Sequence, residues 1–486
     1  MAESFLKNRN FAYVLACSFL AAVALYIVSG LFSRSLWFDE ALTVIDFLTL
    51  PNAADIYRHY TIPNNHIVYN ILLRFWTDIC GPIPLVISLR MFSVLAAFAS
   101  MALILKLWNQ RFCRETTVIA CFCFAVSLPF AIYATAIRGY MLSFLLILVS
   151  LETALCYRDS GKLRHLVFFF IPALLAVGIM PTNLIAFAAI FILVLPSLNP
   201  KDIISNKTLY LGIIPVAAFF IFYIPIFWRL MKALSLSEGW SSGIHASIHF
   251  YSAFLLSFLP LIILAIIGSF FSKEKSGAAL KIQISLIFLA PLVIFLLKYP
   301  APFPRAFFCL WPIWIFILCS MADPIVKQLN LKFPGYALIA ILCICCAWGL
   351  CPYTFSVQLS DNLSKGGQDD FFKPYFMRAD FNPLETVRKS SELAGAKTER
   401  FAFVDFAADY PSIIFYGRLL KINDSFWIFD KPKADGKVGS LGSIESVYVI
   451  ARNRSEMEST GKRFSIKSYE LTADCGYQKI YLARLK

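Results

Sequence analysis

Long apolar runs constrain this chain most, because about 20 consecutive apolar residues can cross a bilayer as one helix. Charged residues make up only 15% of the chain and the mean hydropathy is +0.69, whereas soluble domains carry about 25% charged residues. The sequence therefore predicts an α-helical polytopic membrane protein and excludes a soluble globular enzyme. We expect eleven spanning helices near residues 11–32, 84–108, 116–133, 140–157, 166–180, 184–198, 208–228, 249–271, 282–298, 306–321 and 336–354.

The basic residues gather in the short loops between these runs. Residues 1–354 hold 24 Lys and Arg against 13 Asp and Glu, and residues 355–486 hold 20 against 17. We interpret the net charge of +14 as a topology signal rather than a nucleic-acid surface, since positively charged short loops stay in the cytoplasm. Successive loops alternate between the two sides of the membrane. Fourteen loop Lys and Arg fall on one side and eight on the other. This bias places the loop at 33–83 and the C-terminal tail outside the cytoplasm.

The chain divides into two predicted domains. Residues 1–354 form a transmembrane domain, and its outer loop at 33–83 contains an amphipathic segment at 66–80. That segment is too short to span a bilayer, so its pattern predicts an interfacial helix on the membrane surface.

Residues 355–486 carry more charges and shorter apolar runs, which predicts a small extracytoplasmic α/β domain. Asn382 as a cap and Pro383 at the first helical position predict a helix that ends near Ala394. We expect a further helix and three strands at residues 411–416, and at 400–406, 446–452 and 478–484.

Asp39 and Glu40 are the first candidates for catalysis. They follow Trp37 and Phe38, soon after the first apolar run, where a carboxylate is costly unless it is solvated or functional. A carboxylate there can act as a general base towards a hydroxyl group or bind a divalent cation. The alternative is a pair of solvated loop acids, and position alone does not decide between the two.

Basic residues on the same predicted side are candidates for phosphate binding. Arg138 lies at the outer mouth of the fourth run, and Lys298 and Arg305 lie between the ninth and tenth runs. An Arg guanidinium can hold a phosphate through two parallel hydrogen bonds. The alternative is that these side chains extend to lipid headgroups.

Asn65 and His66 begin the amphipathic segment and could line a site. The alternative is that Asn65 caps the helix and that His66 lies at a solvated boundary. The run with Cys343, Cys345 and Cys346 has no accompanying His or second Cys pair, so we expect no zinc site there.

Three short motifs together resemble the GT-C fold glycosyltransferases. The nearest resemblance is to the family 39-like enzymes, which include protein O-mannosyltransferases, the aminoarabinose transferase of lipid A and bacterial relatives that decorate lipopolysaccharide core. The motifs are Ser-Leu-Trp-Phe-Asp-Glu-Ala at 35–41, the Asn-Asn-His segment at 64–73, and the segment from Tyr133 through Arg138 to Leu142. Arg305 followed by Pro312 is a weaker match. Asn64 and Asn65 stand where many relatives have Pro-Pro.

This resemblance implies an inverting membrane glycosyltransferase. The sugar would come from a polyprenyl-phosphate donor and go to a hydroxyl of a glycolipid, polysaccharide or protein acceptor. Asp39 would be the general base and Glu40 would position the acceptor or support Asp39. Arg138 would hold the donor phosphate with help from Arg305 or Lys298. The residues that would line the site are His66, Asn65, Tyr140 and Tyr133.

The resemblance also implies a location and a set of partners. The protein would lie in a bacterial plasma (inner) membrane, with its active site and C-terminal domain on the periplasmic side. Its partners would be the lipid-linked donor, the acceptor and membrane lipids, with no nucleic acid. Whether a divalent metal takes part is left open, because some GT-C oligosaccharyltransferases use one; we expect no other cofactor.

Two other functions fit the membrane topology. A lipid or sugar transporter or flippase would explain the polytopic core, but the chain shows no internal repeat and its acids lie in a loop rather than within a span. A polymerase or ligase of surface polysaccharide would use a lipid-pyrophosphate donor in the same compartment. The C-terminal domain could also bind carbohydrate or a partner protein.

Overall fold

The structure is a computed structural model of the 486-residue chain. The expected spans at 11–32 and 336–354 lie mostly outside the residues it describes, so the count of eleven spans stays a prediction. Apart from Val14, Ser18, Ala21, Leu25 and Leu338, the described residues are 34–60, 65–81, 84–196, 207–235, 243–271, 278–297, 303–332, 340–345, 380–394, 402–404, 409–421, 426–428, 446–463 and 466–484.

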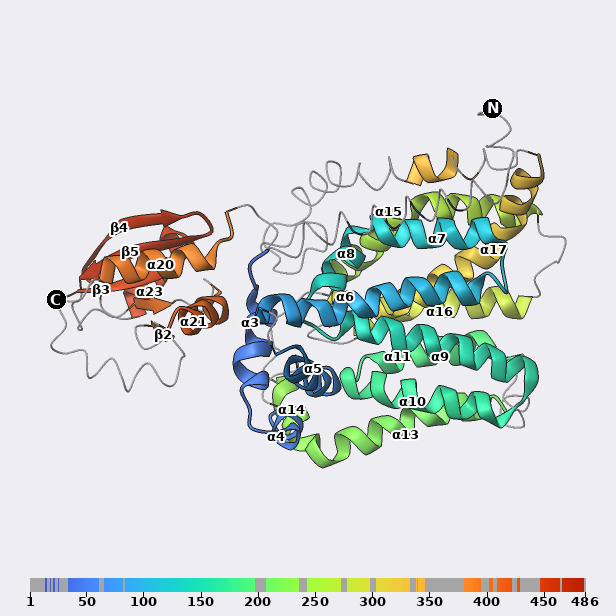
Figure 1. Cartoon of the computed structure of the whole chain (residues 1–486), viewed down its shortest axis with the longest axis horizontal. Coiled ribbons are helices and arrows are strands. Elements are labelled where there is room, and N and C mark those ends of the chain that lie inside the picture. Colours follow the sequence, from blue (N-terminus) through green and yellow to red (C-terminus); the bar gives the residue numbers. More distant parts are fainter. Residues whose placement is uncertain are drawn as a thin grey trace. The chain divides into compact units, whose positions relative to one another are not determined.

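Internal contacts divide the chain into two compact units. The helical unit comprises Met1–Phe32 and Asn52–Lys373, and the mixed unit joins Ser33–Pro51 to Pro374–Lys486. Figure 1 shows the helices of the first unit and the sheet of the second. The sequence did not predict that residues 33–51 would group with the C-terminal region.

The described part of the helical unit contains helices long enough to cross a membrane. In the described part of the chain, six helical stretches pass this test: Leu85–Trp108, Tyr140–Ser160, Leu209–Ala233, Ser247–Phe271, Leu280–Leu297 and Pro304–Asn330. Each coincides with an expected span. The expected spans at 166–180 and 184–198 correspond to two shorter apolar helices, α10 (Leu163–Ile179) and α11 (Asn183–Val194). The protein is therefore an integral multi-pass membrane protein.

The remaining helices of this unit have the following bounds: α4 (Ala53–Arg58), α5 (Ile67–Cys80), α6 (Leu85–Leu103) with the π-helix η2 (Ile104–Trp108), α7 (Arg114–Val126), α8 (Leu128–Thr135), α9 (Tyr140–Ser160), α13 (Leu209–Tyr223) with the 3-10 turn η3 (Ile224–Ile226), α14 (Phe227–Ser235), α15 (Gly243–Phe271), α16 (Ala278–Leu297), and the 3-10 helix η4 (Pro304–Leu310) with α17 (Trp311–Lys332).

The expected span at 116–133 is a bent pair of helices. The axes of α7 and α8 differ by 72°. Ser127 between them has an extended backbone, and its hydroxyl accepts from the Phe130 N–H as a helix cap. Pro129 then lies in the first turn of α8, where a missing N–H costs no helical hydrogen bond. A new helix therefore begins here, and α8 ends just before Arg138.

Close packing holds α15 against α17. The Trp314 indole lies 4.7 Å edge-on from the Phe254 ring and stacks 4.6 Å from Phe288 on α16. A Cβ atom on Gly268 would lie 2.1 Å from the Met321 carbonyl oxygen, so only glycine allows this approach. Small residues at such contacts are typical of membrane helices, which associate through packing rather than through the hydrophobic effect.

The mixed unit contains a five-stranded sheet in the order β2-β1-β3-β5-β4. Strands β2 (Phe426–Ile428), β1 (Ala402–Val404) and β3 (Ser446–Ala451) are parallel. Strand β5 (Gln478–Arg484) pairs antiparallel with both β3 and β4 (Ser468–Cys475), in a register that places Val449 opposite Tyr481. Three helices contact this sheet: α20 (Pro383–Ala394), α21 (Tyr410–Leu419) and α23 (Arg454–Arg463).

Most of the elements expected in this region are present. Helix α20 begins at Pro383, and Asn382 accepts from the Glu385 N–H as its cap. Strands β1, β3 and β5 and helix α21 lie where the sequence predicts them. Strands β2 and β4 and helix α23 were not predicted. The α/β class of the C-terminal region is therefore confirmed.

Candidate functional site

The acidic motif forms the start of a short buried helix. Helix α3 (Phe38–Leu42) continues into a π-helix, η1 (Thr43–Leu48). Asp39 and Glu40 lie in its first turn and are only 4% and 0% exposed. The positive end of a helix favours carboxylates in this turn. A pair of solvated loop acids would be exposed, so the burial of Asp39 and Glu40 argues against that alternative.

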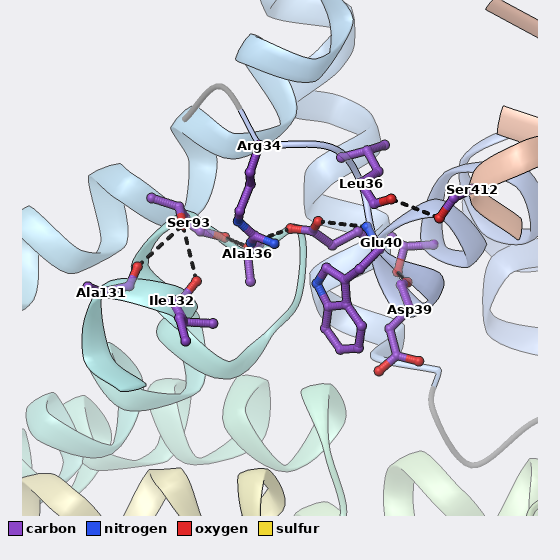
Figure 2. Close-up of polar contacts among 12 residues, drawn as sticks. Arg34, Leu36, Asp39, Glu40, Ser93, Ala131, Ile132, Ala136 and Ser412 are labelled. Atoms are coloured by element: carbon purple, nitrogen blue, oxygen red, sulfur yellow. Dashed lines mark hydrogen bonds and ion pairs between the residues drawn. The ribbon is translucent and has the colours of Figure 1, made fainter. Parts of the chain in front are cut away.

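Glu40 contacts residues that are close to it in the sequence. Its carboxylate forms an ion pair with Arg34 at 2.9 Å, and the side chains are 0% and 7% exposed. The same carboxylate accepts from the Trp37 N–H at 3.4 Å, which satisfies one donor at the start of the helix. Figure 2 shows the Asp39 carboxylate pointing away from this pair. The two acids therefore have different surroundings and can have different roles.

Helix α21 holds the acidic motif in place. The Tyr416 hydroxyl accepts from the Leu36 N–H at 3.0 Å, and the Ser412 hydroxyl donates to the Leu36 carbonyl at 2.8 Å. The Tyr410 ring meets Phe38 edge-on at 5.5 Å. Figure 2 shows the Leu36–Ser412 bond beside the two acids. The C-terminal region thus positions residues that are almost 400 positions earlier in the chain.

A second cluster forms in the helical unit around His66 and Arg138. Arg138 lies in the loop between α8 and α9, and His66 is at the N-cap position of α5. The Arg138 Nη2 atom lies 3.1 Å from His66 Nε2, and the Gly139 N–H donates to His66 Nδ1 at 2.8 Å. The Tyr140 ring lies 4.9 Å from His66 and 4.8 Å from Tyr133. Four residues predicted as site residues therefore lie together.

Side chains from α5 and α6 fix the Arg138 loop. The Ser93 hydroxyl donates to the Ala136 carbonyl at 2.6 Å, so its oxygen accepts from the Tyr69 hydroxyl at 3.1 Å. Arg138 itself is 1% exposed. A side chain that extends to lipid headgroups would be exposed, so burial favours a binding role for Arg138.

Positive charge surrounds His66. Burial, and then the charges of Arg138 and Arg305, holds the pKa of His66 well below its usual value. Arg305 lies at the start of η4, with its guanidinium 4.4 Å from the centre of the Phe303 ring. Burial and the two neighbouring cations thus both disfavour the protonated form of His66.

The other predicted site residues have different outcomes. Asn65 is buried, and its amide donates to the His59 carbonyl and accepts from Asn70. Asn65 therefore connects α4 to α5. His66 rather than Asn65 is at the N-cap position of α5, and its side chain makes no cap hydrogen bond. Lys298 lies outside the described residues.

Sequence reasoning missed two arginines. Arg34 was counted only as a loop charge, although its partner Glu40 is six residues away. Arg90 is fully buried within α6. The available signal was a lone Arg inside an apolar run, since charges within spanning helices are costly and commonly functional. Within the described residues, no three His, Cys, Asp or Glu side chains come together in a way that would hold a metal ion.

Comparison with known proteins identifies the fold. No protein-family model matches the chain, and no curated protein matches it in sequence. The chain is similar to the structure of ArnT from Cupriavidus metallidurans in the apo state, with a TM-score of 0.57 and 10% identity over 96% of this chain and 97% of that one. It is also similar to ArnT bound to undecaprenyl phosphate, with a TM-score of 0.54 and the same identity and coverage. ArnT is a GT-C protein. The chain therefore has the GT-C fold that its sequence motifs predicted.

Proposed function

We propose that this protein is a membrane glycosyltransferase that moves a sugar from a polyprenyl-phosphate donor to a hydroxyl acceptor. The observation that carries the proposal is the likeness to ArnT over 96% of the chain, in a fold that in ArnT binds undecaprenyl phosphate. The buried Asp39–Glu40 pair supports it, because a fixed acid at the start of a helix suits general-base chemistry.

Asp39 is the proposed general base. Its carboxylate takes the proton of the acceptor hydroxyl while the hydroxyl oxygen attacks the anomeric carbon of the donor sugar. The bond between that carbon and the phosphate oxygen breaks, and the bonding electrons leave with polyprenyl phosphate. Attack from the face opposite the leaving group inverts the anomeric centre. Glu40 supports Asp39 through its own bonds to Arg34 and Trp37.

Arg138 is the proposed holder of the donor phosphate. Its guanidinium is buried beside His66, and Arg305 adds a second positive charge. A buried guanidinium binds phosphate strongly because little water competes for its donors. Tyr133 and Tyr140 line the same cluster.

The acceptor and compartment are part of the same proposal. The acceptor is a glycolipid, polysaccharide or protein that presents a hydroxyl group on the periplasmic side of a bacterial inner membrane. Mass spectrometry of glycolipids and surface glycans, from cells with and without the gene, identifies the sugar and the acceptor together. The absence of one glycan species from cells that lack the gene supports transfer. An identical glycan profile in both kinds of cell contradicts it.

The direct test uses the purified full chain with polyprenyl-phosphate sugars and the acceptor found in cells. Asp39→Asn is expected to lower the transfer rate by about 10²–10⁴-fold, the usual contribution of a general base. Full activity in Asp39→Asn would overturn the role of Asp39. Movement of donor across the membrane without transfer would instead indicate a flippase. The same assay with EDTA decides whether a divalent cation takes part.

A further inference from the structure

The mixed unit contains a surface pocket that takes no part in the proposed transfer. Its volume is about 890 Å³, and pockets that bind small molecules usually measure about 300–1,000 Å³. Side chains from α23, β4 and β5 and from the residues next to them line the pocket. Neither the acidic motif nor the cluster around His66 contributes a residue to it.

Positive charge dominates this pocket. Its lining includes one acid, Glu458, and four basic residues: Arg454, Lys462, Lys467 and Lys479. Glu458 pairs with Arg454 at 3.0 Å, and Lys479 pairs with Asp474. Lys462 and Lys467 are exposed and form no ion pair among the described residues. These two lysines give the pocket an excess of positive charge, which favours an anionic ligand.

An aromatic ring held in one place forms part of the pocket wall. The Tyr469 hydroxyl donates to Glu458 Oε1 at 2.9 Å, and its oxygen accepts from Arg454 Nε at 3.3 Å. The ring meets that of Tyr481 edge-on at 5.9 Å. The hydroxyl group is used by these two bonds, so Tyr469 offers a ligand its ring rather than its polar group.

A fixed aromatic ring beside positive charge suits a negatively charged sugar. The C–H groups on one face of a sugar ring pack against an aromatic ring, which buries apolar surface on both. A carboxylate or phosphate on the sugar forms strong charge-assisted hydrogen bonds with Lys. Asn453 and Ser468 also line the pocket, where their polar groups can bond sugar hydroxyls. A small inorganic anion would use the lysines alone.

We propose that the pocket beside α23, β4 and β5 binds a negatively charged saccharide, with Lys462 and Lys467 on its acidic groups and the Tyr469 ring against a sugar ring. The sequence left open whether the C-terminal region binds carbohydrate or a partner protein, and the pocket favours carbohydrate. This site goes beyond the transfer reaction and does not depend on it. Binding by a protein that transfers no sugar would still support the pocket.

Titration of the purified full chain in detergent with a trimer of galacturonic acid tests the ligand class. We expect the trimer to bind, and its affinity to fall as salt is added because the lysines are exposed. Maltotriose has three sugar rings and no carboxylate, and citrate has three carboxylates and no sugar ring. We expect both to bind at least about 10-fold more weakly than the trimer.

Four results of this titration would overturn the proposal. The trimer could fail to bind. Citrate could bind as well as the trimer, which would indicate a simple anion site. Maltotriose could bind as well as the trimer, which would indicate that charge is not recognised. Soluble dihexanoyl phosphatidylglycerol could displace the trimer, which would indicate a lipid-headgroup site.

A double variant tests the two lysines. Lys462→Gln with Lys467→Gln is expected to weaken trimer binding by about 10- to 100-fold, the range for one hydrogen bond to a charged group. Both side chains are exposed, so the fold should be kept. Arg388→Gln with Arg418→Gln removes two exposed charges on α20 and α21 and should leave binding unchanged. Equal losses in the two double variants would reduce binding to net charge and overturn the site.

Two variants of Tyr469 separate its ring from its hydroxyl group. Tyr469→Phe keeps the ring and should keep most of the binding. Tyr469→Ala should weaken trimer binding by about 3- to 10-fold, the range for one aromatic contact, with thermal unfolding as the check that the unit is folded. Wild-type binding by a folded Tyr469→Ala protein, or equal losses in both variants, would overturn the role of the ring.

Discussion

Neighbouring acids in this chain have unequal surroundings. Glu40 contacts Arg34 and the Trp37 backbone, whereas the Asp39 carboxylate points away from that pair. Sequence order alone cannot assign different roles to two adjacent carboxylates. Their separate contacts make the assignment testable through stability as well as activity.

Glu40→Gln is expected to destabilise the fold far more than Asp39→Asn. The change removes the carboxylate from a pair whose side chains are 0% and 7% exposed, and breaking a buried pair costs about 3–5 kcal/mol. The double variant Arg34→Gln with Glu40→Gln should regain part of this loss, because no buried charge is left over. Thermal unfolding of the three variants in detergent measures the difference. A Glu40→Gln protein as stable as wild type would contradict the buried pair.

The low pKa of His66 predicts a loss of stability in acid. Burial, and then Arg138 and Arg305, lowers the pKa in the folded state. The unfolded chain binds a proton below pH about 6.5 that the folded chain does not, so the contribution is complete above that pH and is lost as the pH falls below it.

His66→Gln should therefore lose less stability than wild type when the pH is lowered from about 7.5 to about 5.5. Unfolding midpoints at the two values measure this. His165→Gln is the matched control, because His165 is half-buried at the start of α10 and should keep the wild-type pH dependence. The prediction fails when His66→Gln loses as much stability as wild type.

At the scale of elements, the contact between α21 and the acidic motif fixes the backbone next to Asp39, the proposed general base. Ser412 and Tyr416 hold the Leu36 backbone on both its N–H and its carbonyl. Tyr416→Phe removes the bond to the Leu36 N–H, and Ser412→Ala removes the bond to the Leu36 carbonyl together with the Ser412 contact to Asp409. A lost hydrogen bond costs about 0.5–1.5 kcal/mol.

The combined variant should make amides 36–42 exchange with deuterium faster and should lower sugar transfer, because Asp39 is then less well placed. Ser390→Ala in α20 is the control, since its hydroxyl bonds only within its own helix. Fast exchange with full activity would show that the α21 contact is not needed to position Asp39.

Elements with a local signal could be predicted from the sequence. Helix α20 follows from the cap at Asn382 and the proline after it, and β5 begins and ends where it was expected. Strand β4 was missed because its residues are exposed or half-buried, without the alternation of a one-sided strand. The bend between α7 and α8 has a local cause at Ser127 and Pro129, but the apolar run across it conceals the break.

The candidate site was predicted in its members but not in its contacts. His66 and Arg138 were chosen as polar residues at predicted boundaries, and Tyr140 was chosen because its segment resembles a family motif. Their mutual distances depend on how the start of α5 meets the loop between α8 and α9, and no local pattern encodes that contact. Arg34 was also overlooked, because the sequence shows a charge in a loop but not the ion pair with Glu40 in which the Arg34 side chain is buried.

At the scale of the whole molecule, the eleven spans predicted from the sequence would place both the acidic motif and the C-terminus outside the cytoplasm. A periplasm-active reporter fused after Lys486 should therefore be active, and one fused after Lys201 should be silent, because Lys201 lies in a predicted cytoplasmic loop. A silent C-terminal fusion would mean that the number of spans is even.

The contact between Leu36 and Tyr416 also has a consequence for biosynthesis. The two residues are 380 positions apart, so at about 5–20 residues per second the acidic motif leaves the ribosome roughly 20–80 s before the helix that holds it. During this interval the early spans can already enter the membrane, while Asp39 has none of its support from α21. A prematurely terminated chain would carry the acids without holding them in place. The order of translation therefore decides when a newly made molecule can become active.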